Sequence, residues 1–168
     1  VSTQIGYKES SENYLVAADG VTKQGYTRYG EWFGDKYGEW SGMFVSFCLD
    51  YAGVDRNEFP IESDLNRQIT KLKEKALYHK STTEYRPKAG DLIFFDDDKY
   101  DIAADDNRTA DRVGFVYEVV YEKGSKRIVG IKAVEGDSND RVEIKEYDII
   151  DGTILGYGEI PDRSIGVL

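Results

Sequence analysis

Residues 25–54 read GYTRYGEWFGDKYGEWSGMFVSFCLDYAGV, and the change of pattern within them decides the fold. A lead-in rich in glycine and aromatic residues ends at Trp40, and from Ser41 onward apolar residues recur at the spacing of a helix. The apolar residues of this stripe are Phe44, Phe47, Cys48 and Tyr51. We therefore expect a buried helix over about residues 37–52, closed by Gly53 as its C-cap, with Ser41 near its first turn.

Ser41 occupies a position at which a helix can present a nucleophile. The N-terminus of a helix carries partial positive charge, which favours a thiolate or an oxyanion. A serine gains less from this position than a cysteine, because its hydroxyl must give its proton to a partner base. The pattern thus predicts the geometry of a thiol hydrolase in a chain that lacks the thiol at this position.

Length and composition describe one soluble globular domain. The chain has 168 residues, of which 40% are hydrophobic and 32% are charged. Its net charge of -10 argues against a nucleic-acid binder, which needs a basic face for phosphates. No apolar run approaches the roughly 20 residues of a spanning helix, so we expect no membrane insertion. The single cysteine, Cys48, argues against a disulfide or a cysteine zinc cluster, and we interpret it as a buried hydrophobe.

The periodicity changes along the chain from helical to strand-like. Helices are expected over residues 10–18, 37–52 and 63–77, and strands over residues 92–95, 113–121, 127–134, 141–147 and 153–160. This order predicts an α+β fold in which N-terminal helices pack on a C-terminal antiparallel sheet of about five strands. We expect a single domain over residues 1–168, helical over about 1–80 and strand-rich over about 88–168.

Nine local motifs occur in an order that resembles a known family. They are YTRYG (26–30), YGEWS (37–41), FVSFC (44–48), YAGV (51–54), ALYH (76–79), PKAGDLIFFD (87–96), VGFV (113–116), VEGDS (134–138) and ILGYG (154–158). Together they resemble the CHAP family, the cysteine- and histidine-dependent amidohydrolase/peptidase domains. The resemblance implies a papain-like, NlpC/P60-type fold and an ancestry among enzymes that cut peptidoglycan cross-bridges or the bond between muramic acid and alanine.

The resemblance also assigns positions to a catalytic site. It equates Ser41 with the family's cysteine, Arg112 with its histidine, and the stretch from Glu135 to Asp137 with the group that orients the histidine. Arginine stays charged in proteins and cannot accept the proton of the serine. It can instead pair with Glu135 or Asp137 and close the site with a salt bridge. Replacement of both essential residues predicts a catalytically inactive member.

The acidic stretch 96–107 is the candidate metal loop. The resemblance implies a calcium loop here, and the ligand residues would be Asp96, Asp98 and Asp101. The run is stretched and lacks the turn glycine of such loops, so the favoured interpretation is a solvated acidic loop. No other cofactor is predicted. Among the aromatic residues, we expect Tyr29 and Trp40 to line a ligand groove and the others to fill the core.

Three functions remain open on these observations. The leading hypothesis is an inactive CHAP-like domain that serves as a binding or scaffold module and recognises peptidoglycan or a protein partner. The alternatives are an active peptidoglycan amidase or endopeptidase with Ser41 as nucleophile, and a purely structural spacer domain. The resemblance implies a bacterial protein that is extracellular or on the cell surface. The oligomeric state is left open.

Overall fold

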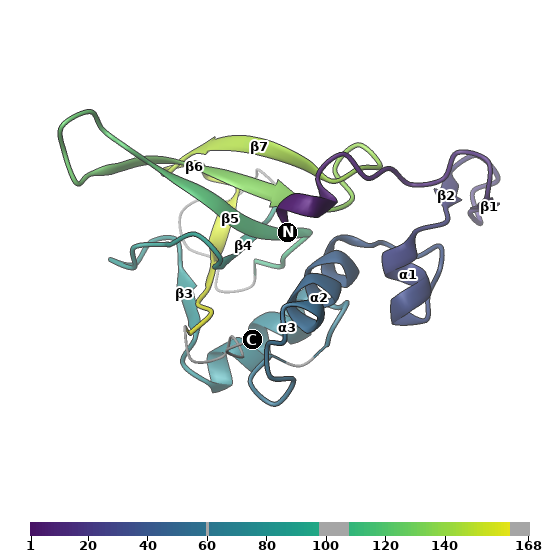
Figure 1. The fold of residues 1–168 in the computed structure, drawn as a ribbon, viewed down its shortest axis with the longest axis horizontal. Coiled ribbons are helices and arrows are strands. Elements are labelled where there is room, and N and C mark those ends of the chain that lie inside the picture. The colour runs from purple at the N-terminus through teal and green to yellow at the C-terminus, as the bar shows by residue number, and fades with distance from the viewer. Residues whose placement is uncertain (60, 98–107, 162–168) are drawn as a thin grey trace.

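The computed structural model describes residues 1–59, 61–97 and 108–161 as a mixed α+β structure (Figure 1). Its helices are the 3₁₀ helix η1 (Ser2–Gln4) and the α-helices α1 (Arg28–Phe33), α2 (Ser41–Tyr51) and α3 (Leu65–Glu74). Its strands are β1 (Tyr14–Val16), β2 (Lys23–Gly25), β3 (Tyr78–Lys80), β4 (Leu92–Phe95), β5 (Arg112–Tyr121), β6 (Ile128–Glu135), β7 (Glu143–Asp148) and β8 (Ile154–Gly158). Within the described residues, none of the helices is long and apolar enough to cross a membrane.

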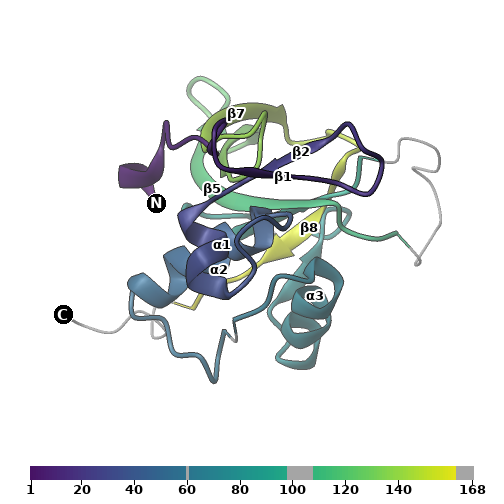
Figure 2. The same cartoon turned by 90° about the vertical axis from the view of Figure 1, so that its right-hand side faces the viewer.

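The main sheet has six strands in the order β3-β8-β4-β5-β6-β7, and each neighbouring pair is antiparallel. Helices α2 and α3 lie on one side of this sheet (Figures 1 and 2). Strands β1 and β2 form a separate hairpin that projects from the body next to α1 (Figure 1). The α+β class and the antiparallel sheet are therefore confirmed, with one more strand than expected, and the papain-like assignment stays a prediction.

Strand β4 is buried on both of its faces, and this divides the core in two. Leu92 and Phe94 belong to the cluster that includes Phe44 of α2, whereas Ile93 and Phe95 belong to a second cluster on the other face of the sheet. Side chains alternate between the two faces of a strand, so a central strand with apolar residues at every position must be covered on both sides. All four side chains of β4 are fully buried.

Glycine lets the end of β6 pass very close to α2. A Cβ placed on Gly136, the residue after β6, would lie 2.7 Å from the Cβ of Phe44. A Cβ on Gly42 in the first turn of α2 would lie 2.5 Å from the carbonyl oxygen of Ser63. Real Cβ atoms do not occur at such distances, so both contacts require glycine. The start of α2 is thus fixed against β6 and against the segment before α3.

The prediction near the N-terminus was wrong, and one short strand further along the chain was missed. The expected helix over residues 10–18 is a turn followed by β1. The Ser10 hydroxyl does accept the N–H of Asn13, at 3.0 Å, as a helix cap would, but the chain then extends and pairs residue by residue with β2. The short strand β3 was not predicted either, because three residues are too few to show a period. Helix α2 begins at Ser41 rather than near residue 37, and α3 falls within its expected range.

The burial of Phe44 predicts a large loss of stability when this ring is removed. Phe44→Ala should lower the free energy of unfolding by about 3–5 kcal/mol, because it leaves a cavity beneath the sheet. Tyr51→Ala, on the same helix, is the matched control, since the Tyr51 side chain is 71% exposed. Urea denaturation measures both. A similar loss in the two variants would contradict the packing of α2 on the sheet.

Candidate functional site

Ser41 is the first residue of α2 and is buried, with 8% of its surface exposed. The N-cap residue, Trp40, provides no side-chain cap, and its carbonyl oxygen accepts the first helical bond from Phe44. Within the part of the chain that the structure describes, the Ser41 hydroxyl has no hydrogen-bond partner. A serine nucleophile needs a base to take its proton, and no base is hydrogen-bonded to Ser41 among the described residues.

Two carboxylates hold the residue that precedes Ser41. The backbone N–H of Trp40 donates to Asp137 Oδ2 at 3.0 Å, and its indole Nε1–H donates to Glu9 Oε2 at 2.9 Å. Asp137 lies in the turn after β6 with a positive φ of 61°, a conformation that aspartate and asparagine adopt more readily than most residues. The start of α2 is therefore attached to the N-terminal segment through Glu9 and to the β6–β7 turn through Asp137.

Asp137 belongs to a group of carboxylates. Ligand atoms of Glu9, Asp137 and Asp140 all lie within 4.8 Å of one another, so this triad could hold an ion. Burial raises the pKa of Asp137 to about 7; the bond from Trp40 opposes the rise, and the charges of Glu39 and Glu9 add to it. The negative charge at this end of α2 is thus concentrated on one side of Ser41.

Arg112, at the start of β5, is held by four hydrogen bonds. Two run to Asp97, each at 2.7 Å, one to Glu135, and one to the hydroxyl of Tyr147 at 3.2 Å. The guanidinium also lies 4.5 Å from the centre of the Phe95 ring. Burial alone would lower the pKa of Arg112, but the bonds to Asp97 and the charge of Glu135 raise it above its ordinary value.

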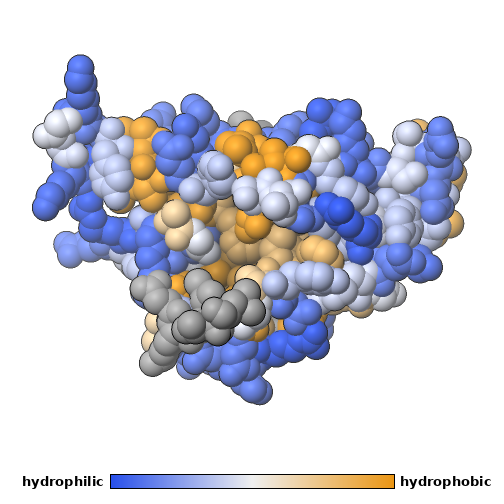
Figure 3. All heavy atoms as spheres, in the orientation of Figure 1, coloured by the Kyte–Doolittle hydropathy of each residue, from blue (hydrophilic) through white to orange (hydrophobic). Residues whose placement is uncertain are grey.

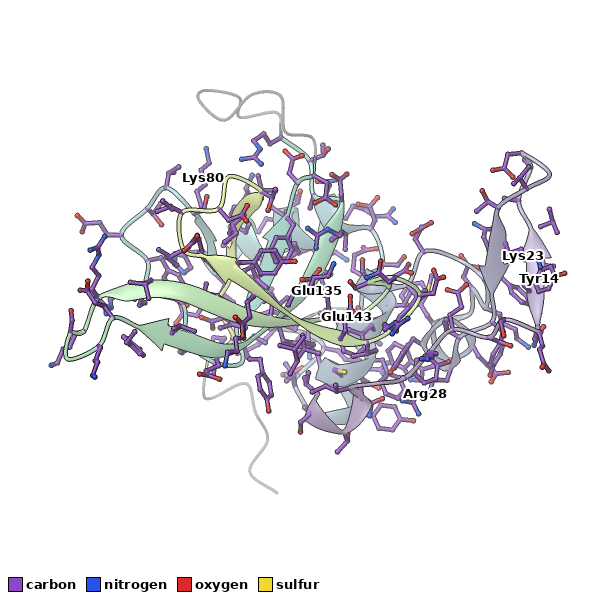
Figure 4. All side chains as sticks on the ribbon, turned by 90° about the horizontal axis from the view of Figure 1, so that it is seen from above. Tyr14, Lys23, Arg28, Lys80, Glu135 and Glu143 are labelled. Carbon is purple, nitrogen blue, oxygen red and sulfur yellow. The ribbon has the colours of Figure 1, made fainter. Side chains whose placement is uncertain are left out.

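Glu135 is the buried partner in the ion pair with Arg112. Its side chain is 1% exposed and also accepts the Tyr147 hydroxyl at 2.5 Å. Burial raises the pKa of the Tyr147 hydroxyl above its ordinary value, and the neighbouring Glu135 carboxylate raises it further. The tyrosine therefore remains a hydrogen-bond donor. Figure 4 shows Glu135 beside Glu143, its register partner on β7. The carboxylate and the arginine sit with Phe95 on the face of the sheet that carries the second core cluster.

The four positions that the resemblance assigned to catalysis therefore form two groups. Asp137 contacts the backbone at the start of α2, whereas Arg112 pairs with Glu135, and Gly136 separates the two carboxylates. Of the two salt bridges expected for Arg112, the one with Glu135 forms. Among the described residues, Arg112 and Ser41 share no hydrogen bond. A guanidinium in this setting can position neighbours and balance charge, but it cannot accept a proton.

Part of the candidate calcium loop is visible. Asp98 and Asp101 lie outside the described residues. Asp96 is 4% exposed, and its Oδ2 accepts the Nε–H of Arg108 at 2.6 Å. Arg108 also donates to the carbonyl oxygen of Gly152 at 3.0 Å. In the described part of this loop a guanidinium therefore balances the Asp96 charge.

The expected groove residues Tyr29 and Trp40 are core residues, so that prediction was wrong. They are 0% and 1% exposed, and their rings stack with centres 5.4 Å apart. Tyr7 packs edge-on against both rings. The sequence shows that these residues are aromatic, but it does not show on which side of α1 and α2 the core lies.

The residues of the site that were not anticipated include Glu9, Asp97 and Tyr147. Asp97 lies in the acidic stretch and was interpreted as solvated. Tyr147 is flanked by Glu146 and Asp148, but β7 has no regular alternation of apolar and polar residues that would mark the ring as inward-facing. No sequence pattern marks Glu9 as part of the site, because its hydrogen-bond partners Gly25 and Trp40 are far away in sequence.

No protein-family model, no curated protein and no solved structure matches this chain. The likeness to CHAP domains therefore rests on the motifs of the sequence. The position of Ser41 at the start of α2 and the pairing of Arg112 with Glu135 are observations on this chain alone. The function that they support is a proposal.

Removal of Arg112 should strongly destabilise the protein. Arg112→Met leaves the Glu135 carboxylate buried without its cation, which we expect to cost about 3–5 kcal/mol of unfolding free energy. The matched control is Lys132→Met on β6, whose partner Glu118 is 52% exposed, and there we expect little change. Chemical denaturation compares the two variants. Equal effects would show that the Arg112 pair is not the main counter-charge of Glu135.

Proposed function

We propose that this chain is a catalytically inactive CHAP-like domain that acts as a binding or scaffold module of a bacterial cell-surface or secreted protein. The observation that carries the proposal is the engagement of Arg112 by Asp97, Glu135 and Tyr147. A group that is always protonated occupies the position where the resemblance requires a base. The reaction class of the family needs a base that gains and loses a proton in each turnover.

The ligand that best fits this site carries a positive charge. The Arg112 charge is balanced by two carboxylates, so a carboxylate ligand gains little from it. The surroundings of Trp40 and Ser41 instead hold Glu9, Glu39, Asp137 and Asp140. We infer that an amine-bearing wall peptide, or a protein partner with basic side chains, is recognised there. Figure 3 shows apolar side chains between the sheet and the helices on the face that it draws.

Calcium is a further part of the proposal. The oxygen atoms of Glu9, Asp137 and Asp140 are close enough together for such an ion, and carboxylate oxygens are the ligands that calcium takes in proteins. The assays below are therefore run both with calcium and with a chelator, so that an effect of calcium is measured separately from the effect of each substitution.

A second candidate, an active hydrolase with Ser41 as nucleophile, is favoured by one observation. Asp137 is bound to the backbone N–H that precedes Ser41, and its pKa of about 7 is in the range of a general base. This route requires the Asp137 carboxylate to reach the hydroxyl of Ser41 in the presence of substrate.

Hydrolysis of purified peptidoglycan separates the two candidates. We expect no turnover by the unmodified domain. A Ser41→Cys, Arg112→His double variant, in which Glu135 is placed to pair with the new histidine, should show turnover only if that histidine can reach residue 41 from the face of the sheet on which Arg112 lies. Release of soluble wall fragments measures the rate. The two single variants are the controls, since each lacks one half of the dyad.

The outcomes distinguish the hypotheses. Turnover by the unmodified domain that is lost in Asp137→Asn would overturn the inactive assignment in favour of the Ser41 hydrolase. No turnover by a folded double variant would mean either that residues 41 and 112 do not meet as a dyad or that the site no longer admits wall substrate in a reactive position. Failure of the domain to bind wall as well would leave the spacer domain as the best explanation.

Binding to the wall tests the ligand directly. Reversal of the exposed charge of Glu39 in Glu39→Lys should weaken cosedimentation with purified peptidoglycan about tenfold or more, because it places a cation beside the amine of the ligand. Glu118→Lys on β5 carries the same change and belongs to an exposed ion pair with Lys132, away from α2. Equal binding by both variants would place the ligand elsewhere.

A further inference from the structure

Strand β7 lies at one edge of the main sheet, and part of its outer side is unpaired. Its inner side pairs with β6, which is its only strand partner among the described residues. The bond from the Ile149 N–H to the Val129 carbonyl oxygen shows that odd-numbered residues of this segment direct their backbone groups toward β6. Backbone groups alternate in direction along a strand, so those of Ile144 and Glu146 point outward. Figure 1 shows β7 along the border of the sheet, away from α2 and α3.

The N-terminal segment pairs with the first part of this outer edge. The Val142 N–H donates to the carbonyl oxygen of Tyr7, and the N–H of Gly6 donates to the Val142 carbonyl oxygen, both at 2.9 Å. An isolated antiparallel bridge continues this pairing by one residue. Within the described parts of the chain, the backbone groups of Ile144 and Glu146 have no hydrogen-bond partner. The edge therefore accepts an extended antiparallel segment at one end and is open over the rest.

A row of side chains with alternating charge crosses the sheet and ends at β7. Glu118 of β5 lies opposite Lys132 of β6, which lies opposite Glu146 of β7. The Lys132 ammonium is 3.0 Å from the Glu118 carboxylate and 3.9 Å from that of Glu146, so Glu118 is its closer partner. Opposite charges on directly paired residues attract each other across a sheet. A cation on an added strand, opposite Glu146, would therefore continue the alternation.

The rows on either side specify two more positions of an added strand. On one side the Ile144 side chain is 40% exposed, so an apolar side chain fits opposite it. On the other side Gly130 lies between its register partners Val120 and Asp148. Glycine leaves room there for a hollow of about 350 Å³, whose lining includes these three residues and Glu146. A lysine opposite Asp148 can place its aliphatic stem in this hollow and its ammonium beside the carboxylates.

We propose that the outer edge of β7 is a docking site for an extended basic segment of a partner protein, which joins the sheet as an additional antiparallel strand. The backbone of this segment pairs with Ile144 and Glu146, and its alternate side chains give the specificity. In order from its N-terminus, they are a lysine opposite Asp148, a basic residue opposite Glu146 and an apolar residue opposite Ile144. This surface is separate from the start of α2, and the inference does not depend on the function proposed for that site.

The β7 strand of a second copy of this chain does not fit the edge. Lys145 is the only basic residue of β7, so a second β7 cannot place cations opposite both Glu146 and Asp148. An antiparallel register that places this lysine opposite Glu146 also places Glu143 opposite Asp148. Like charges directly opposite each other are unfavourable. The charges of the edge therefore favour a different chain as its partner.

A designed peptide tests the docking site. The probe has seven residues and blocked ends, and alternates threonine with lysine, lysine and valine, in that order. Binding should slow hydrogen exchange of the Ile144 and Glu146 amides about tenfold or more, as measured by NMR. The amides of Lys145 and Tyr147 should not change, because they already face β6.

Two control peptides separate the contributions of backbone and charge. One carries N-methyl groups on its second lysine and its valine, whose amides would pair with β7, and it keeps every side chain. The other has glutamate in place of both lysines. Each should bind at least tenfold more weakly than the probe, because the first loses hydrogen bonds to the edge and the second places like charges together.

Matched variants of the protein test the same charge from the other side. Glu146→Lys should weaken binding of the probe about tenfold or more, because it places a cation opposite a cation. Glu74→Lys makes the same change of net charge on α3, whose Lys73 lies over the ring of Tyr78 in β3, at the opposite edge of the sheet. It should leave binding unchanged. Both glutamates are exposed, so both variants should fold.

Three results would overturn the proposal. The first is no binding of the probe by the unmodified protein at about 1 mM peptide. The second is equal binding of the lysine and glutamate peptides, or equal binding of the probe by Glu146→Lys and Glu74→Lys. The third is self-association of the unmodified protein in analytical ultracentrifugation that Glu146→Lys abolishes, which would make a second copy the occupant of the edge.

Discussion

The close contact between Gly136 and Phe44 is the constraint on which the arrangement of the site depends. No side chain fits between the end of β6 and α2 at this point, so the chain passes directly against the helix. The residues on either side of the glycine then face different surroundings. Asp137 meets the backbone at the start of α2, and Glu135 turns to Arg112 on the other face of the sheet. One short segment thus fixes α2 to the sheet and separates the acidic groups into two sets.

The two sets of carboxylates differ in the groups that balance their negative charge. Glu135 is almost wholly buried and is matched by a guanidinium and a phenol. The carboxylates of Glu9 and Asp137 accept indole and backbone N–H donors instead, and among the described residues no salt bridge involves them. Position 112, where the resemblance requires a proton acceptor, therefore holds a paired arginine that cannot accept a proton. The carboxyl group whose burial raises its pKa, Asp137, lies instead at the start of α2.

Much of the fold could be predicted from the sequence where the pattern of apolar residues is long enough to be recognised. Strand β4 has the bounds expected from its four apolar residues, and α3 begins after Asp64, whose side chain caps the N–H of Arg67. The prediction failed over residues 10–18, where a capping turn is followed by strand pairing. It also failed for Tyr29 and Trp40, whose aromatic character fits a groove as well as a core. In the first case the deciding contacts come from the neighbouring strand β2, and in the second they include Tyr7, which is remote in sequence.

The sequence by itself determined the α+β class, the presence of a buried helix with Ser41 near its first turn, and the presence of an arginine where the resemblance expects a histidine. These are local properties of residue type and period. Only the tertiary structure decided that Arg112 pairs with Glu135 rather than Asp137, and that Glu9 joins Asp137 at the start of α2. The reason is physical: the energy of a charge depends on burial and on neighbours brought together by the fold, and neither is encoded in the spacing of residues along the chain.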